Sequence, residues 1–142
     1  MDVDSSTIET HLALGGLYRK RGEFDKAILI HQNLLSRPTL EIELKNQALY
    51  ELAKDFHSAG LYDRSEKIFK NLSEIKSYKE SCLGHLLKIY EVTKDWERAI
   101  ELVKSMNDIP LGVAYWSDKS VNKYTYILRT LFRFIKFRIF LF

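Results

Sequence analysis

The sequence predicts an all-α fold, a right-handed solenoid of about three helical hairpins followed by an atypical C-terminal segment. A set of matched positions recurs three times along the chain, first after 38 residues and then after 34. A period of this length is typical of stacked helical repeats, in which each unit packs only on its neighbours. Only two prolines and six glycines occur in 142 residues, so the chain has few breaks and is long enough for six helices.

The matched positions have the same order in each copy. Two apolar residues four apart are followed by a turn residue, a large aromatic residue, a small residue and a final apolar residue. These positions are Leu14, Tyr18, Gly22, Phe24, Ala27 and Leu34 in the first copy, Leu52, Phe56, Gly60, Tyr62, Ser65 and Leu72 in the second, and Leu86, Tyr90, Lys94, Trp96, Ala99 and Met106 in the third. An irregular helical bundle needs amphipathic spacing but not this order, so we favour the repeat.

Each copy predicts two antiparallel helices joined by a tight turn. The two leading apolar residues share one face of the first helix, because residues four apart are neighbours on a helix, and we expect that face to be buried. Gly22 and Gly60 can end the first helix in a left-handed conformation at low steric cost, whereas Lys94 must do so without this freedom. The aromatic residue then fills the space between the helices, and the small residue allows their close approach.

The helix boundaries follow from local signals. Ser6 and Glu9 have the spacing of a capping box at the start of the first helix. Arg37 precedes Pro38, and the residue before a proline avoids the helical region, so the second helix ends there. The expected helices cover residues 7–20, 24–36, 42–58, 62–74, 79–93 and 95–106. We expect a repeat array over residues 1–113, with repeats at about 7–40, 42–78 and 79–110, and a basic aromatic tail over residues 114–142.

Charge is distributed unevenly along the chain. Residues 1–113 carry 16 Lys or Arg and 18 Asp or Glu, whereas residues 114–142 carry 6 and 1. The predicted array therefore lacks the basic footprint of nucleic-acid binding, and we expect no nucleic-acid partner. The acidic N-terminus lacks the layout of a secretory signal, and no apolar run is long enough for a transmembrane span. We therefore expect a cytoplasmic protein.

Residues that often carry chemistry do not form a recognisable active site or metal site. Cys82 is the only cysteine, so an internal disulfide is excluded, and we interpret it as a small core residue. His31 takes the position of an aromatic residue in a second helix and is interpreted as a packed side chain, while His11 and His85 have no partner four residues away. Metalloprotease and nucleophile motifs are missing from the sequence. We expect no catalytic residue, no metal site and no cofactor.

The first helices of a stacked array line its concave surface, which solenoids use to bind partners. We therefore expect a protein or peptide in this groove, with Tyr50 and Arg19 as the leading contacts for an acidic partner or a C-terminal carboxylate. The predicted binding residues are Arg19, Lys20, Tyr50, Lys54, His57, Lys88 and Glu91. The predicted structural repeat positions are Gly22, Phe24, Ala27, Gly60, Tyr62, Ser65, Trp96 and Ala99. A merely solvated helix face is the alternative for any single binding residue.

The segment 124–142 is rich in aromatic residues and contains no acidic residue. On a helix, Arg129, Arg133 and Lys136 share one face while most other positions are apolar, a pattern found in segments that lie at a membrane surface. Arg138 falls on the opposite side and weakens this hypothesis. Two alternatives remain open: the tail is the product of an altered reading frame, or it covers the exposed end of the third hairpin.

The three copies resemble the tetratricopeptide repeat. Segments 15–35, 59–69 and 86–100 are similar, more specifically, to the bacterial lipopolysaccharide assembly protein B family. The tripeptides Arg21-Gly22-Glu23 and Ile30-His31-Gln32 carry this similarity, since they are not part of the general repeat consensus. The resemblance covers about residues 7–106. It implies a non-enzymatic adaptor at the cytoplasmic side of the inner membrane that couples a membrane-bound ATP-dependent protease to the lipid A deacetylase. That family also has an N-terminal membrane helix and a C-terminal four-cysteine metal-binding domain. We therefore interpret this sequence as a fragment and assign it neither membrane anchoring nor metal binding.

Overall fold

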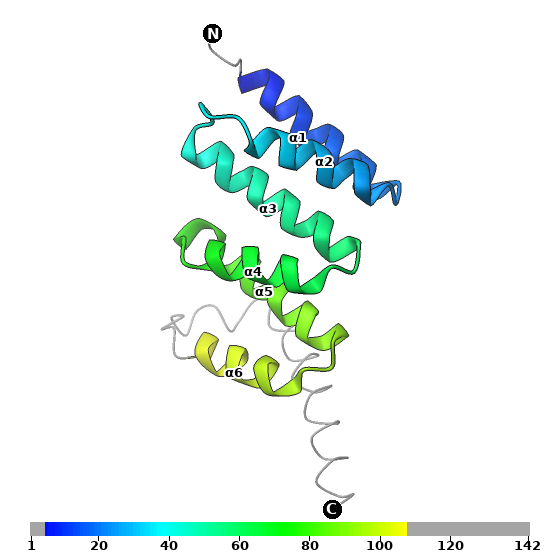
Figure 1. Cartoon of the computed structure of the whole chain (residues 1–142). Coiled ribbons are helices and arrows are strands. Elements are labelled where there is room, and N and C mark those ends of the chain that lie inside the picture. Colours follow the sequence, from blue (N-terminus) through cyan, green and yellow to red (C-terminus); the bar gives the residue numbers. More distant parts are fainter. Residues whose placement is uncertain (1–4, 108–142) are drawn as a thin grey trace, which may run out of the picture. The chain divides into compact units, whose positions relative to one another are not determined.

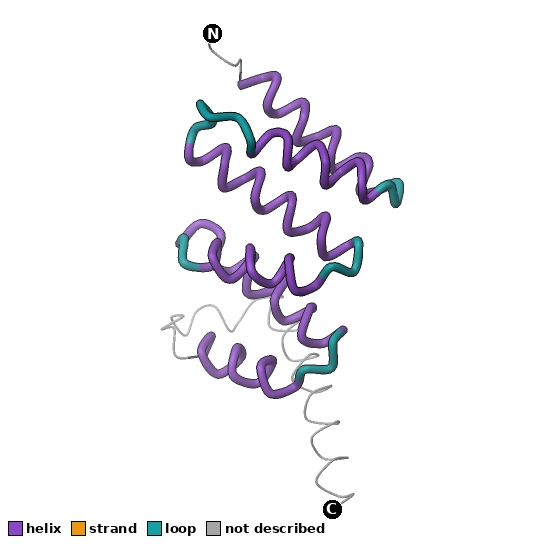
Figure 2. The backbone as a smooth tube through the Cα atoms, viewed as in Figure 1, coloured by secondary structure: helices purple, strands orange, loops and turns teal. Residues whose placement is uncertain are grey.

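A computed structural model describes residues 5–107 of the chain as six α-helices joined by short turns (Figures 1 and 2). The helices are α1 (Ser5–Lys20), α2 (Phe24–Leu35), α3 (Ile42–Ser58), α4 (Tyr62–Ser73), α5 (Lys76–Val92) and α6 (Trp96–Asn107). No strand occurs within these residues. The structure therefore confirms the all-α fold and the six helices that the repeat predicts.

Three helix starts differ from those expected. The fifth helix begins at Lys76, three residues earlier than expected, and the sixth begins at Trp96, one residue later than expected. The first helix already includes Ser5, two residues earlier than expected, so Ser6 lies within its first turn. The chain forms two compact units, residues 1–93 with α1–α5 and residues 94–142 with α6. The predicted tail, 114–142, and its segment 124–142 lie outside the described residues.

Within the first unit, each helix packs against its neighbours in chain order. The helix α1 contacts α2 and α3, α2 contacts α3, α3 contacts α4, and α4 contacts α5. Figure 1 shows the hairpin of α1 and α2 lying beside α3. Small side chains permit these contacts, since Ala27 and Ser65 are fully buried and the hydroxyl of Ser65 donates to the carbonyl oxygen of Ala53 at 2.8 Å. Packing between sequence neighbours is what a repeat array requires.

The turns inside the three hairpins share one backbone conformation. Gly22 and Gly60 have φ angles of 80° and 76°, and Lys94 adopts 60° at the matching position. A side chain in this left-handed region costs roughly 1 kcal/mol relative to glycine. The helix after each turn begins with the aromatic residue of the repeat, Phe24, Tyr62 or Trp96, and each of these side chains is half-buried.

One expected core position is exposed. Leu14 on α1 is 40% exposed, whereas its repeat equivalents Leu52 and Leu86 are 5% and 2% exposed. The helix α2 packs against α3, and α4 packs against α5, but no helix in the described part of the chain precedes α1. The expectation that the whole apolar face of the first helix is buried therefore fails in the first copy, because burial there depends on a preceding neighbour.

A glycine sets the separation of α1 and α2. Gly15 is buried in α1, and a Cβ atom at this position would lie 2.4 Å from Nε2 of His31 on α2. The imidazole is itself fully buried and hydrogen-bonded to Asp55, so it has little room to move. The adjacent Gly16 differs, since a Cβ there would meet its nearest atom, Nη2 of Arg19, at 3.7 Å.

We predict opposite effects for alanine at these two glycines. Gly15→Ala should lower the free energy of unfolding by about 2 kcal/mol, because overpacking a close helix contact outweighs the gain in helix propensity. Gly16→Ala, the matched control, should leave stability unchanged or raise it by up to about 1 kcal/mol. Urea denaturation followed by circular dichroism measures both. Equal effects of the two substitutions would contradict the close contact between Gly15 and His31.

Candidate functional site

The predicted binding residues lie on α1, α3 and α5, which are the first helices of the three copies. We call this the first-helix surface and define it by Arg19, Lys20, Tyr50, Lys54, His57, Lys88 and Glu91, together with His85. The α1 and α3 parts are in contact, and side chains of α3 and α5 also meet. The three helices therefore contribute to one continuous region of the first unit.

Arg19 connects α1 to α3 through its guanidinium group. Its Nη2 lies 2.7 Å from Oε2 of Glu51, and its Nη1 lies 2.6 Å from Oδ1 of Asp55. The Nη1 group also donates to the backbone carbonyl of Glu51 at 3.2 Å. Charge-assisted bonds of this kind are shorter and stronger than neutral ones. Arg19 therefore acts first as a structural link between the two helices.

Asp55 receives a second partner from α2. Its carboxylate is fully buried, and Oδ2 accepts a hydrogen bond from Nδ1 of His31 at 2.5 Å. The other ring nitrogen, Nε2, lies 3.4 Å from the carbonyl oxygen of Leu12 on α1. His31 is thus a packed side chain, as expected. Its two ring nitrogens also make polar contacts that link α2 to α3 and to α1.

The structure corrects the expected exposure of Arg19. Helical spacing predicts Arg19 on the exposed side of α1, but only 13% of its side chain is exposed, because Glu51 and Asp55 hold it against α3. Lys20 is exposed at the end of the same helix. Contact of Arg19 with a partner remains a prediction, and these ion pairs make it a poor first choice.

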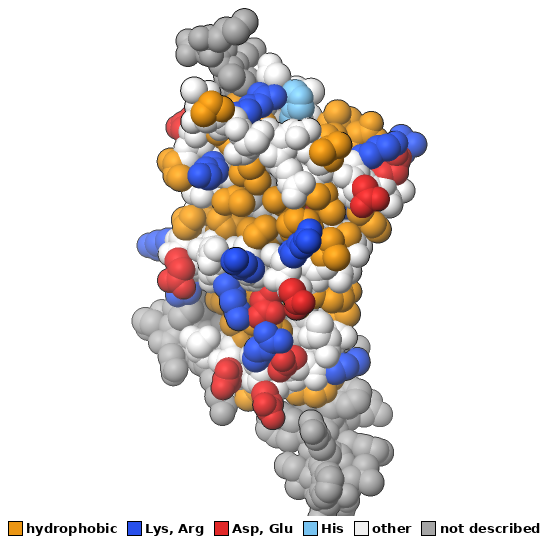
Figure 3. Space-filling view, in the orientation of Figure 1, with side chains coloured by type: hydrophobic (Ala, Val, Ile, Leu, Met, Phe, Trp, Pro, Cys, Tyr) orange, Lys and Arg blue, Asp and Glu red, His pale blue; other side chains and the backbone are white. Residues whose placement is uncertain are grey.

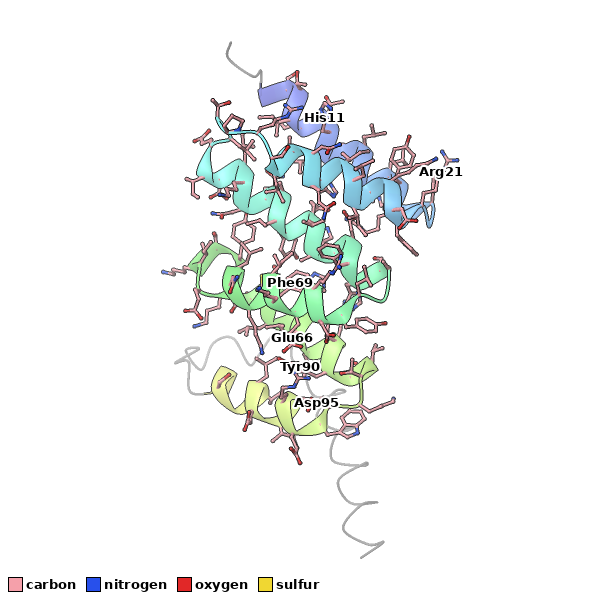
Figure 4. The ribbon with its side chains drawn as sticks, in the orientation of Figure 1. His11, Arg21, Glu66, Phe69, Tyr90 and Asp95 are labelled. Atoms are coloured by element: carbon pink, nitrogen blue, oxygen red, sulfur yellow. The ribbon has the colours of Figure 1, made fainter. Side chains whose placement is uncertain are left out.

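An aromatic and histidine cluster occupies the α3 and α5 part of the surface. The hydroxyl of Tyr50 lies 3.1 Å from Nε2 of His85, and the imidazole of His85 stacks on Phe69 of α4 with ring centroids 4.6 Å apart. Tyr50 also packs edge-on against Phe69 and at a tilt against Tyr78. Phe69, labelled in Figure 4, contributes its ring to this cluster from α4. His57 continues the cluster, 6.3 Å from the ring of His85.

Burial keeps both histidines of the cluster neutral at pH 7. Burial and then the charge of Lys88 lower the pKa of His85 to about 4, and the same two causes lower the pKa of His57. Among the described residues, Nε2 of His57 and Nδ1 of His85 are buried and have no hydrogen-bond partner. Such polar atoms are rare in protein interiors, so they are candidates for contact with a ligand.

Cations border the cluster on both helices. The ammonium of Lys54 lies 2.8 Å from Oε1 of Glu51 and 5.3 Å from the centre of the Tyr50 ring. Lys88 is exposed on α5, and Glu91 one turn later is half-buried. The structure brings together Tyr50, Lys54, His57, His85 and Lys88 on α3 and α5, whereas Lys20 lies at the end of α1 and Glu91 lies one turn beyond Lys88.

A different face of the molecule is visible in Figure 3. Over the region of α4 in that view, cationic and anionic side chains are interleaved. Lys70 illustrates this pattern, since it pairs with Glu66 at 2.7 Å. The α4 region in this view therefore carries charges of both signs side by side.

A tetratricopeptide repeat model matches residues 10–43, which include the first hairpin. The solved structure of a putative kinesin light chain from Podosopora anserina, with nearly identical tetratricopeptide-like repeats, aligns with a TM-score of 0.64 over 84% of this chain and 62% of that one. Its sequence is 16% identical, so this likeness shows the fold alone. Family model, fold and repeat positions agree. The chain carries tetratricopeptide repeats.

Two curated relatives are similar over most of the chain. Lipopolysaccharide assembly protein B of Escherichia coli K12 is 41% identical over 103 residues, which cover 72% of this chain and 26% of that protein. The protein of the same name from Haemophilus influenzae is 38% identical over 117 residues, which cover 78% of this chain and 30% of the relative. The chain thus spans between a quarter and a third of the length of these relatives.

The tetratricopeptide fold and these relatives point to a non-catalytic repeat protein. Within residues 5–107, no group of three or more His, Cys, Asp or Glu side chains is placed to hold a metal ion. Cys82 is buried, and burial raises the pKa of its thiol to about 11, so it is a protonated core residue at pH 7. None of the helices in the described part of the chain is both long and apolar enough to cross a membrane.

Four residues that build or support the first-helix surface were not predicted from the sequence pattern. They are Gly15, Glu51, Asp55 and His85. A signal for one of them was present, because Asp55 takes the repeat position held by Leu17 and Ile89 in the other copies. A charged residue at an otherwise apolar position indicates a buried partner, and His31 is that partner.

We predict that His85 makes the folded state sensitive to acid. Its folded pKa is about 4 and its ordinary value is 6.5, so the unfolded chain binds a proton that the folded chain excludes between these values. The contribution of His85 to stability is therefore present above pH 6.5 and is lost as pH falls toward 4. His85→Gln should lose less unfolding free energy than the parent between pH 7 and pH 4.5, measured by urea denaturation.

The control for this prediction is His11→Gln on α1, whose ring lies outside the cluster and contacts the carbonyl oxygen of Thr7. This variant should keep the acid sensitivity of the parent chain. If His85→Gln and the parent lose the same free energy over this pH range, His85 does not have a lowered pKa in the folded state.

Proposed function

We propose that the chain is an adaptor module that holds a protein partner against the first-helix surface. The observation that carries this proposal is the cluster of Tyr50, His57 and His85, which offers aromatic rings and two buried nitrogens with no hydrogen-bond partner among the described residues. Side chains fixed in this way lose little entropy when a partner binds. Rigid, partly buried aromatic residues are also typical of binding hot spots.

The chemistry of the surface favours an acidic peptide segment or a C-terminal carboxylate. Lys54 and Lys88 are one repeat apart, at matching positions of α3 and α5, and both border the cluster. Their ammonium groups supply the positive charge that an acidic partner requires. The histidines are neutral, so they offer hydrogen bonds to that partner without adding charge. Arg19 contributes indirectly, since it fixes Glu51, which in turn pairs with Lys54.

The curated relatives suggest a more specific role. We propose that this module takes part in regulating lipopolysaccharide production, as the name of the relatives and the shared repeat sequence support. In this proposal the partners are a membrane-bound ATP-dependent protease and the lipid A deacetylase, which the module brings together. It would then work at the cytoplasmic face of the inner membrane, bound to membrane proteins.

We predict that Lys88→Glu combined with His57→Ala reduces recovery of the protease or the deacetylase at least about tenfold. Both side chains lie on the first-helix surface, and loss of one charge and one hydrogen-bonding ring typically costs more than 1.4 kcal/mol of binding. The measurement is a pull-down with the tagged chain from a lysate of a lipopolysaccharide-producing bacterium, with both proteins quantified by mass spectrometry.

Lys67→Glu is the matched control, because Lys67 is exposed on the second helix α4 and outside the first-helix surface. It should leave recovery unchanged. Recovery that survives the double substitution would remove the surface from the proposal. Recovery of other proteins in place of both enzymes, lost with the double substitution, would keep the surface and overturn the lipopolysaccharide role.

A further inference from the structure

The outer side of α1 differs from the matching sides of α3 and α5. On α1 this side consists of Thr10, Ala13, Leu14 and Leu17, and we call it the α1 outer face. All four residues are exposed, with Leu14 at 40% and Leu17 at 53%. Two large apolar side chains one turn apart on an exposed helix form a small apolar patch rather than scattered surface residues.

The repeat shows what such a face normally contacts. The positions that match Thr10, Leu14 and Leu17 are Ala48, Leu52 and Asp55 on α3 and Cys82, Leu86 and Ile89 on α5. All six are buried, between 0% and 5% exposed, and another helix packs against each of these two helices, α2 against α3 and α4 against α5. The α1 outer face therefore has the composition of a helix-packing surface.

Charge indicates which helix fits it. Glu9 and Lys20 are both exposed and flank the α1 outer face. They are eleven residues apart, about three helical turns, so both lie along the same edge of the face with opposite charges at its two ends. A parallel twofold copy of α1 would place these charges on opposite edges of the interface, whereas an antiparallel copy keeps them on one edge and places Glu9 beside Lys20 at both ends.

We propose that two copies of the chain associate through their α1 outer faces, with the two α1 helices antiparallel. A twofold axis near Leu14 and Gly15 then brings the leucines of each copy over the small side chains Thr10 and Ala13 of the other. The same patch serves both partners, which is the self-complementarity that a twofold interface requires. The aromatic and histidine cluster lies on α3 and α5, so it is not part of this interface and can still bind a protein partner.

We predict a reversible dimer of the full chain in sedimentation velocity over a dilution series. Leu17→Asp should raise the dimer dissociation constant roughly a hundredfold, since twofold symmetry applies each substitution twice. Because Leu17 is exposed, the variant should fold normally, which circular dichroism checks. Leu29→Asp is the matched control: Leu29 is 56% exposed but lies on α2, so this variant should dimerise like the parent.

Charge reversal tests the antiparallel arrangement. Glu9→Lys and Lys20→Glu should each raise the dissociation constant about fivefold, because each places like charges together at both ends of the interface. The double variant should restore the parent value, since the attraction is re-formed with the signs exchanged. A parent chain that remains monomeric, a dimer unaffected by Leu17→Asp, or a double variant as weak as the single ones would overturn the proposal.

Discussion

The buried carboxylate of Asp55 is the constraint on which the first three helices depend. A charge removed from water is costly unless it is paired and hydrogen-bonded, and Asp55 is satisfied from two directions. Arg19 of α1 binds one oxygen and His31 of α2 binds the other, so a single side chain of α3 fixes both neighbours. Hydrogen bonds are directional, and this geometry holds the first hairpin in one register on α3.

The same polar network reaches the surface. Arg19 also binds Glu51, and Glu51 binds Lys54, which lies over the ring of Tyr50. The packing of the first hairpin thus helps to position side chains that we propose to contact a partner. The contact between α4 and α5 is built with different chemistry, since His85 stacks on Phe69 and the hydroxyl of Tyr90 donates to Glu66 at 3.0 Å. Glu66, Phe69 and Tyr90 are labelled in Figure 4.

The sequence predicted the helices well because the signals for them are local. The spacing of Leu52 and Phe56, and the turns at Gly22 and Gly60, each depend on a few adjacent residues. Exposure was harder to predict because it depends on which element lies alongside. Leu14 was expected to be buried and is exposed, whereas Arg19 was expected to be exposed and is largely buried. Six matched positions per repeat describe the shared framework and cannot describe where one copy departs from it.

Those departures nevertheless carry information. His31 stands where the second copy has Phe69, and Asp55 stands where the third copy has Ile89. Each substitution alone would place a polar group in an apolar site, and together they form a buried pair. Two off-pattern polar residues at one repeat interface therefore predict each other, and Gly15 provides the space that the imidazole needs.

A double-mutant cycle at this pair tests the central claim most directly. His31→Phe and Asp55→Ile introduce the residues found in the other copies, and the free energy of unfolding is measured for the parent, both single variants and the double variant. Each single variant should lose about 3 kcal/mol or more, because it removes one partner of a buried hydrogen bond and leaves the other partner unpaired at that atom, whereas the double variant should recover at least half of the summed loss. Additive losses would show that His31 and Asp55 do not act as a pair and would contradict the account.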